Sequence, residues 1–96
     1  MSVTLCVLLW AREGRDADLT RYEDQVLGLV GDHDGRVLQR VQTVDPGDQP
    51  SEVQILQFGS AAALEEYTQD PRRAALAGQR DAAIARTDVL PVRLLS

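Results

Sequence analysis

The order of the predicted segments constrains this chain most: a strand, a helix, two strands, a helix and a final strand. The first strand, residues 3–10, has almost nothing polar on either of its faces. A strand with one face in water alternates polar and apolar residues, whereas a strand buried on both faces need not. Two helices can cover only one face of a four-stranded sheet. The other face therefore needs a second cover, and the simplest candidate is another copy of the chain.

The first predicted helix follows a polar loop and ends near residue 33. Asp16 or Asp18 is expected to cap its start, and Gly35 is expected to take the left-handed conformation that ends many helices. Apolar and long side chains recur at steps of three and four, which is typical of one helical stripe. The stripe comprises Leu19, Glu23, Val26, Val30 and His33.

Two alternating segments, residues 36–44 and 52–58, flank a turn-forming stretch with two prolines at residues 45–51, which predicts a β-hairpin. A helix is expected from residue 61, with Ser60 as its N-cap. Asp70 and Pro71 should end this helix and start a new helical segment that runs to about residue 86. Residues 89–95 are predicted to form the last strand, and Pro91 favours an edge position or a bulge.

The order β-α-β-β-α-β with right-handed crossovers predicts a ferredoxin-like α+β fold. This fold has a four-stranded antiparallel sheet with both helices on one face, and its first and third strands lie in the centre. The 96 residues are enough for one domain and too few for two, so residues 1–96 are interpreted as a single domain.

Composition excludes several classes of function. The net charge is -5, every basic residue is arginine, and residues 52–58 carry no basic residue, which argues against a nucleic-acid partner. Cys6 is the only cysteine, so no internal disulfide and no paired-cysteine metal site is expected. The longest apolar stretch is about half the roughly 20 residues that span a bilayer, and no signal peptide is evident. We therefore expect a cytoplasmic protein with no membrane partner, no metal and no cofactor.

Short motifs along the chain resemble a known family. They are an aromatic residue in the first helix, a Gly-Arg start to the second strand, a Phe-x-Ser entry to the second helix, an aromatic residue before an Asp-Pro break, and an Arg-Asp pair. The residues concerned are Tyr22, Gly35-Arg36, Phe58-Gly59-Ser60, Tyr67-Thr68-Gln69-Asp70-Pro71 and Arg80-Asp81. This pattern resembles a small bacterial family of unknown function in the dimeric α/β-barrel superfamily, alongside the antibiotic-biosynthesis monooxygenases.

The resemblance implies a homodimer whose two sheets face each other as a barrel, with a cavity between each sheet and its helices. It implies no single activity, since relatives include cofactor-free monooxygenases, isomerases, polyketide cyclases and proteins with no known chemistry. The monooxygenases use an asparagine in the pocket, often with a tryptophan. This chain has Trp10 but no asparagine, so that pair of residues does not carry over.

Two residues are candidates for proton transfer. His33 is the only histidine and an obvious general base, although a histidine at a helix C-terminus also interacts well with the helix dipole. Glu23 lies on the inner stripe of the first helix, where burial would raise its pKa. The alternative for Glu23 is an edge position in which it is solvated or paired with an arginine.

Five further residues are candidates for ligand binding. Arg80 lies four residues from both Leu76 and Ile84, so its helical face is apolar and its guanidinium could hold a ligand carboxylate. It could equally form an internal ion pair or reach water along its stem. Arg40 is a second anion anchor or a partner for Glu23. The other three, which could line an aromatic pocket or simply belong to the core, are Trp10, Tyr22 and Tyr67.

Sequence alone therefore predicts a small homodimer with an apolar pocket for a small organic ligand in each subunit. The alternative is a cofactor-independent enzyme of secondary metabolism that carries out isomerisation, cyclisation or oxygenation. Arg72 and Arg73 are interpreted as surface or dimer salt-bridge residues, because positive charge is unfavourable at the start of a helix.

Overall fold

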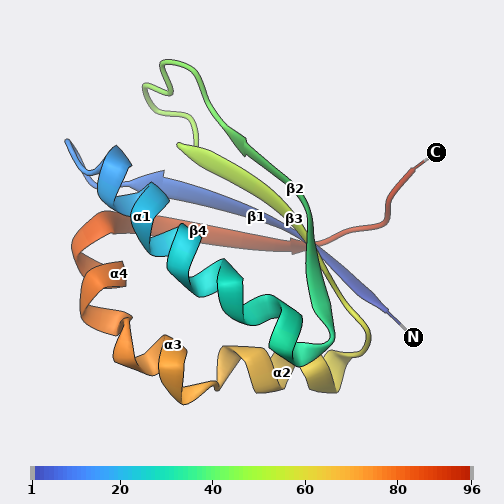
Figure 1. Ribbon diagram of the computed structural model, residues 1–96. Helices are drawn as coiled ribbons and strands as arrows, with labels where there is room; N and C mark the ends of the chain where they lie inside the picture. The colour runs from blue at the N-terminus through green and yellow to red at the C-terminus, as the bar shows by residue number, and fades with distance from the viewer. Residues whose placement is uncertain (1, 96) are drawn as a thin grey trace.

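The computed structural model describes residues 2–95 and contains one sheet with helices on one side (Figure 1). Its strands are β1 (Val3–Ala11), β2 (Gly35–Gln42), β3 (Glu52–Phe58) and β4 (Ile84–Pro91). Its helical segments are α1 (Asp16–Val26), the 3-10 segment η1 (Leu27–His33), α2 (Ala61–Thr68), α3 (Pro71–Ala75) and α4 (Ala77–Ala83).

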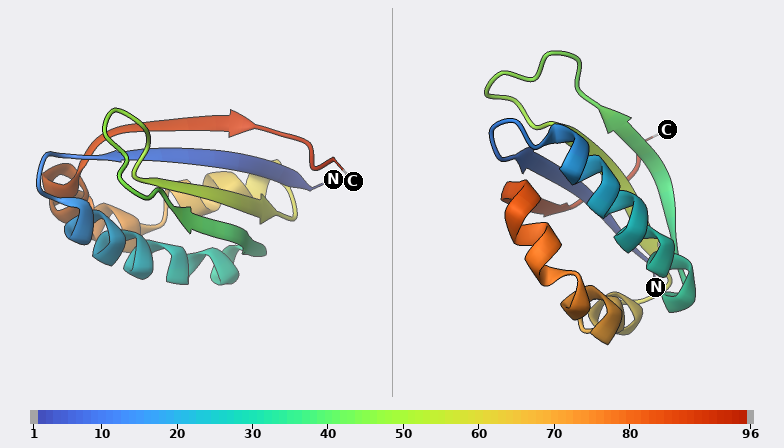
Figure 2. Two further views of the ribbon diagram at one scale, coloured as in Figure 1. Left: turned by 90° about the horizontal axis from the view of Figure 1, so that it is seen from above. Right: turned by 60° about the vertical axis from the view of Figure 1, so that its left-hand side comes forward.

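The sheet is antiparallel throughout, with the strand order β2-β3-β1-β4. The prediction that the first and third strands are central is therefore confirmed, and the fold is ferredoxin-like. Seen from above in Figure 2, the sheet forms one layer and all helices lie in a second layer beneath it. Pro91 is the last residue of β4, which pairs with a neighbour on one side only. A proline, which has no backbone N–H, is tolerated at such an edge position.

The first helix starts and ends differently from the prediction. Neither Asp16 nor Asp18 caps α1, because Arg15 occupies the N-cap position and makes no side-chain cap. At the other end Asp34, not Gly35, takes the left-handed conformation, with φ 55°. Gly35 instead begins β2, where a Cβ would lie 2.7 Å from the ring of Phe58. The lack of a side chain at Gly35 thus serves close packing.

The helical region after β3 starts as predicted. The Ser60 hydroxyl accepts a hydrogen bond from the backbone N–H of Ala63, and the Asp70 carboxylate accepts one from the backbone N–H of Arg72. A further break at Leu76, which was not predicted, separates α3 from α4.

The last helix and strand correct the prediction by several residues. α4 ends at Ala83 rather than near residue 86, and β4 begins at Ile84 rather than at Val89. Pairing with β1 explains the difference, since Ile84 pairs with Ala11 and its side chain joins the core. The backbone hydrogen bonds of the sheet outweigh the helical propensity of the alanine-rich segment.

The two faces of the sheet have different surroundings. Inward side chains of β1 and β3 pack against α1, η1 and α2 and form the core. Outward side chains alternate with them, are partly exposed on the central strands, and have no helical layer over them. On the central strands they include Cys6, Leu8, Trp10, Val53 and Ile55, and on the edge strands the half-exposed Val41 and Leu90.

Candidate functional site

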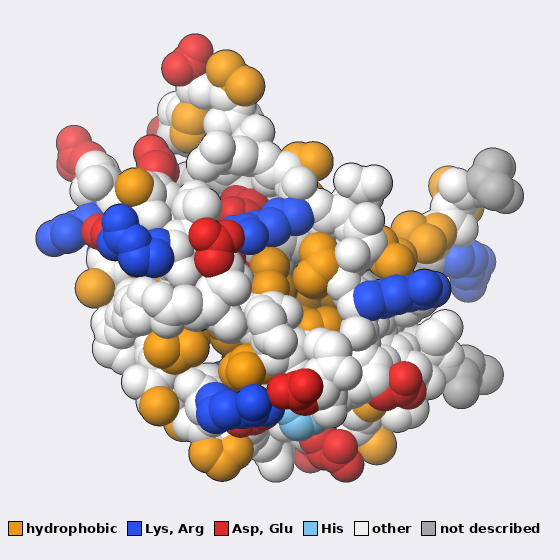
Figure 3. Space-filling model, viewed as in Figure 1, with side chains coloured by type: hydrophobic (Ala, Val, Ile, Leu, Met, Phe, Trp, Pro, Cys, Tyr) orange, Lys and Arg blue, Asp and Glu red, His pale blue; other side chains and the backbone are white. Residues whose placement is uncertain are grey.

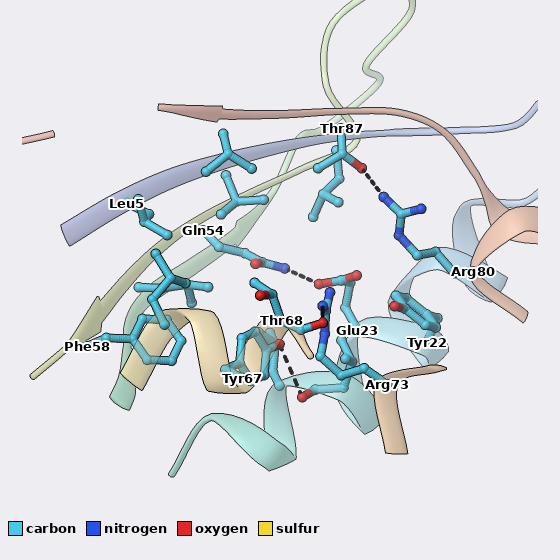
Figure 4. Close-up of a pocket in the computed structure, with 17 residues that line it drawn as sticks. Leu5, Tyr22, Glu23, Gln54, Phe58, Tyr67, Thr68, Arg73, Arg80 and Thr87 are labelled. Carbon is cyan, nitrogen blue, oxygen red and sulfur yellow. Dashed lines mark hydrogen bonds between the residues drawn. The ribbon is translucent and has the colours of Figure 1, made fainter. Parts of the chain in front are cut away.

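A cavity of about 270 Å³ lies between the inner face of the sheet and the helical layer. Side chains from β1, β3 and β4 form one wall, and side chains from α1, η1, α2, α3 and α4 form the other (Figure 4). Most of the lining is aliphatic or aromatic. These apolar residues are Leu5, Val7, Leu9, Tyr22, Val26, Leu27, Leu56, Phe58, Leu64, Tyr67 and Val89.

A buried polar pair interrupts this apolar lining. The side-chain amide of Gln54 donates hydrogen bonds to the carboxyl groups of Glu23 and Glu52, each at 2.7 Å. Glu52 in turn accepts a hydrogen bond of 2.7 Å from Nε of Arg40. Glu52 and Gln54 occupy the inward positions of β3 that continue the register of Leu56, so strand alternation places two polar groups at one end of the core.

Glu23 is a buried carboxyl group that reaches the cavity. Its side chain is 5% exposed, and burial raises its pKa above the ordinary value of 4.5. The hydrogen bond from Gln54 opposes this rise, and the nearby charge of Glu52 adds to it. A carboxyl group whose pKa lies closer to neutrality can exchange a proton with a bound molecule.

Two arginines enter the cavity from the helical layer. Arg73 lies over the ring of Tyr67, with its guanidinium carbon 4.7 Å from the ring centre, and donates a hydrogen bond to the backbone oxygen of Thr68. Arg80 reaches toward Thr87 at 3.5 Å, a long contact (Figure 4). The two guanidinium groups lie on the helical side of the space that Glu23 faces.

Aromatic side chains complete the cavity. Tyr67 lies against Phe58, with ring centres 5.2 Å apart, and its hydroxyl reaches the backbone oxygen of Val26. Burial raises the pKa of Tyr67 to about 12 and also raises the pKa of Tyr22. Both phenols are therefore neutral hydrogen-bonding groups at physiological pH.

The structure brings four of the seven predicted site residues to the cavity. Tyr22, Glu23, Tyr67 and Arg80 belong to its lining. Ile84 belongs to β4, so it does not share a helical face with Arg80, and that part of the prediction is wrong. The remaining three, His33, Arg40 and Trp10, are not in the lining.

His33 lies at the end of η1 in a cluster of charged groups. Its Nε2 is 2.8 Å from the carboxylate of Asp70, which also accepts hydrogen bonds from Arg72. Arg72 further pairs with Asp32 at 3.0 Å, and Figure 3 shows the imidazole among acidic and basic atoms. This cluster joins the end of η1 to the start of α3. Arg72 therefore forms salt bridges within its own chain, as one of the two predicted roles required.

Arg40 and Trp10 also have structural partners. Arg40 pairs with Glu52 and Asp24, so it faces the helices but does not contact Glu23 directly. Trp10 is on the outward face of the sheet, where its indole N–H donates to the backbone oxygen of Asp48. The guanidinium of Arg86 lies over its ring at 4.4 Å.

Gln54 and Arg73 are site residues that sequence reasoning did not select. The signal for Gln54 was available, since an amide at an inward position of a central strand needs a buried partner. Arg73 had been assigned to the surface. It follows the break at Asp70 and lines the cavity beside Tyr67 of α2, a contact that residue spacing alone does not predict.

Within residues 2–95, no three side chains of histidine, cysteine, aspartate or glutamate lie together in a way that could hold a metal ion. None of the helices described is long and apolar enough to cross a membrane.

Comparison with known proteins places the fold among bacterial structures. No protein-family model matches the chain, and no curated protein sequence matches it. A Pseudomonas aeruginosa protein aligns with a TM-score of 0.76 at 20% identity, over 99% of this chain and 95% of its own. A Bacteroides fragilis protein described as dimeric, of unknown function and ferredoxin-like aligns with a TM-score of 0.73 at 12% identity, over 97% and 96%.

A third structure carries a provisional activity. This protein from Bacteroides thetaiotaomicron, provisionally named an antibiotic biosynthesis monooxygenase, aligns with a TM-score of 0.72 at 15% identity, over 99% of this chain and 90% of its own. At these identities the comparisons establish the shared fold.

Proposed function

We propose that the chain forms a single-domain homodimer in which each subunit binds a small, mainly apolar organic ligand in the sheet–helix cavity. The observation that carries this proposal is the cavity itself, about 270 Å³ with a mainly apolar lining into which a buried carboxyl–amide pair and two arginines project. Protein interiors are close-packed, and large apolar pockets with a few convergent polar groups are the usual form of a small-molecule site.

The buried pair of Glu23 and Gln54 is better explained by ligand binding than by a contribution to fold stability. Glu23 accepts one hydrogen bond, from Gln54, and has no cationic partner within 4.0 Å among the residues described. A buried carboxyl group without an ion pair lowers the stability of a fold. Its position at a cavity gives it a role that the fold does not require.

The uncovered face of the sheet supports the homodimer. Most outward residues of the two central strands are apolar, with Thr4 and Gln57 as the polar pair among them, and no second helical layer lies over them (Figure 2). A contiguous apolar surface of this kind is typical of an interaction site. The Bacteroides fragilis structure with the same fold is described as dimeric, which favours a second copy as the partner.

A second candidate is a cofactor-independent enzyme of the monooxygenase, isomerase or polyketide cyclase type. The raised pKa of Glu23 favours it, because general acid–base catalysis works best with a group that titrates near the working pH. Glu23 is then the proton acceptor, since His33 lies outside the lining and is paired with Asp70.

The cytoplasmic location remains a prediction.

Fluorescence of N-phenyl-1-naphthylamine, a neutral apolar probe, tests the binding proposal. We expect a saturable signal with one probe per chain. Val89→Phe should weaken binding at least about tenfold, because this edge-strand residue lines the cavity and the larger ring occupies its space. Val44→Phe is the matched control, since Val44 is 85% exposed and is not in the lining.

Equal binding by the two variants would place the probe elsewhere and contradict the proposal. Absence of saturable fluorescence in the unmodified protein would contradict it as well.

A further inference from the structure

We propose that the ligand of this cavity is an organic anion, whose apolar body fills the interior and whose oxyanion is held at the mouth by Arg73 and Arg80. This inference rests on the proposed function and specifies the chemistry of the molecule that is bound. It is carried by the hydrogen bonding, the charge and the position of the two guanidinium groups.

The Arg73 guanidinium is poorly compensated within the chain. By distance and angle the guanidinium makes one hydrogen bond among the residues described, to the backbone oxygen of Thr68 at 3.2 Å, and it lies close enough to the hydroxyls of Tyr22 and Tyr67 to oppose the rise in the pKa of both. Its Nε is buried and has no hydrogen-bond partner among the residues described. No carboxylate of the described chain lies within 4.0 Å of it; its guanidinium carbon lies 4.7 Å from the ring centre of Tyr67, and its charge opposes the rise in the pKa of Glu23 from farther away.

Arg80 is similarly available. Its nearest carboxylate is that of Asp81 at 4.0 Å, and its hydrogen bond to Thr87 is 3.5 Å long. By contrast, five other arginines have a carboxylate oxygen within 3.0 Å. These are Arg15, Arg21, Arg40, Arg72 and Arg86.

The charge of the lining favours an anion. Its ionisable groups at neutral pH are the two guanidinium groups and the carboxyl of Glu23, so positive charge is in excess. This excess is unusual in a chain whose net charge is -5. Burial raises the pKa of Glu23, and each proton that it keeps increases the positive charge further.

The positions of Arg73 and Arg80 place the oxyanion of the proposed ligand at the mouth of the cavity. Tyr22, Arg73 and Arg80 line both the cavity and a shallow surface depression beside it, so they lie at the boundary between the two. Asp70 also borders the depression, but its carboxylate is engaged by His33 and Arg72. Leu5 and Phe58 lie on the side of the cavity away from Arg80 (Figure 4), and with the other apolar side chains of β1 and β3 they fit an apolar body.

Matched pairs of ligands test this inference: 3-phenylpropanoate with 3-phenylpropanamide, and hexanoate with hexanamide. Binding is followed residue by residue in ¹H–¹⁵N correlation spectra at constant pH and salt. We expect each acid to bind at least about tenfold more tightly than its amide, as charge-assisted hydrogen bonds to arginine predict. Resonances of the cavity lining should shift with both members of a pair.

Variants that remove a positive charge test which arginines cause the preference for the acid over the amide. Arg73→Gln and Arg80→Gln should each reduce the ratio of acid to amide affinity, and the double variant should bring it to about one. Arg80→Lys keeps the charge on a side chain that is 43% exposed and should retain part of the preference. Arg21→Gln removes the same charge from the exposed face of α1 and should leave the ratio unchanged.

The outcomes separate the two proposals. Equal affinity of acid and amide, with shifts confined to the cavity, would overturn the anion inference and leave cavity binding in place. A preference for the acid that survives the double variant would also overturn it. Failure of both acids and both amides to shift cavity resonances would contradict cavity binding itself.

Discussion

Glu23 combines features that rarely occur together in a small core. Its carboxyl group is buried, bonded to a neutral amide rather than to a cation, and adjacent to open space. The sequence placed it on the inner stripe of the first helix and left open a buried carboxyl with a raised pKa or an edge residue that is solvated or paired with an arginine; its burial and the direction of its pKa shift favour the first. Its partner Gln54 could not be selected in the same way, because contact between α1 and β3 depends on tertiary packing.

The pH dependence of stability tests this environment. The native carboxyl group keeps its proton above pH 4.5, where the unfolded chain releases it, so the free energy of unfolding should fall as pH rises from 4.5 through the native pKa. Glu23→Gln removes this titration. The stability of the variant relative to the unmodified protein should therefore increase between pH 4.5 and pH 7, as measured by urea unfolding. If the stability difference between the variant and the unmodified protein stays constant or decreases over this pH range, the environment of Glu23 does not disfavour the charged carboxylate.

Some helix and strand boundaries could be predicted from the sequence because local backbone interactions determine them. Others could not, because they depend on tertiary contacts. Ser60 and the Asp70-Pro71 pair act through their own backbone, so the starts of α2 and α3 were predicted correctly. Ile84 lies at a helical spacing from Arg80, and only its pairing with Ala11 of β1 places it in a strand. Gly35 was assigned to a turn because glycine commonly ends helices. The ring of Phe58, distant in sequence, is what excludes a side chain there.

Substitution at Gly35 tests that packing. A Cβ at Gly35 would lie 2.7 Å from Phe58 and 2.8 Å from Val30, and both neighbours are buried, so Gly35→Ala should destabilise the protein by about 1–3 kcal/mol. Gly28→Ala is the matched control, because nothing lies within 4 Å of its added carbon. That variant should change stability by less than about 1 kcal/mol, in the stabilising direction. Equal losses in urea unfolding would refute the packing role.

In the whole molecule, the two faces of the sheet have different proposed functions. Its inner face borders the cavity, and its outer face presents the apolar surface that we assign to the dimer. Ile55 lies on the outward side of central strand β3, so Ile55→Arg should prevent dimer formation by burying an unpaired charge. Ala62→Arg adds the same charge on the exposed side of α2 and should leave the dimer intact.

Sedimentation velocity with N-phenyl-1-naphthylamine, detected at a wavelength that only the probe absorbs, tests the central claim most directly. The account predicts that the probe sediments with a species of twice the 10.5 kDa of one chain, at one probe per chain. The Ile55→Arg variant should sediment at the mass of one chain. Probe absorbance that stays at the meniscus, or an unmodified protein that sediments as a single chain at every concentration, would contradict the account.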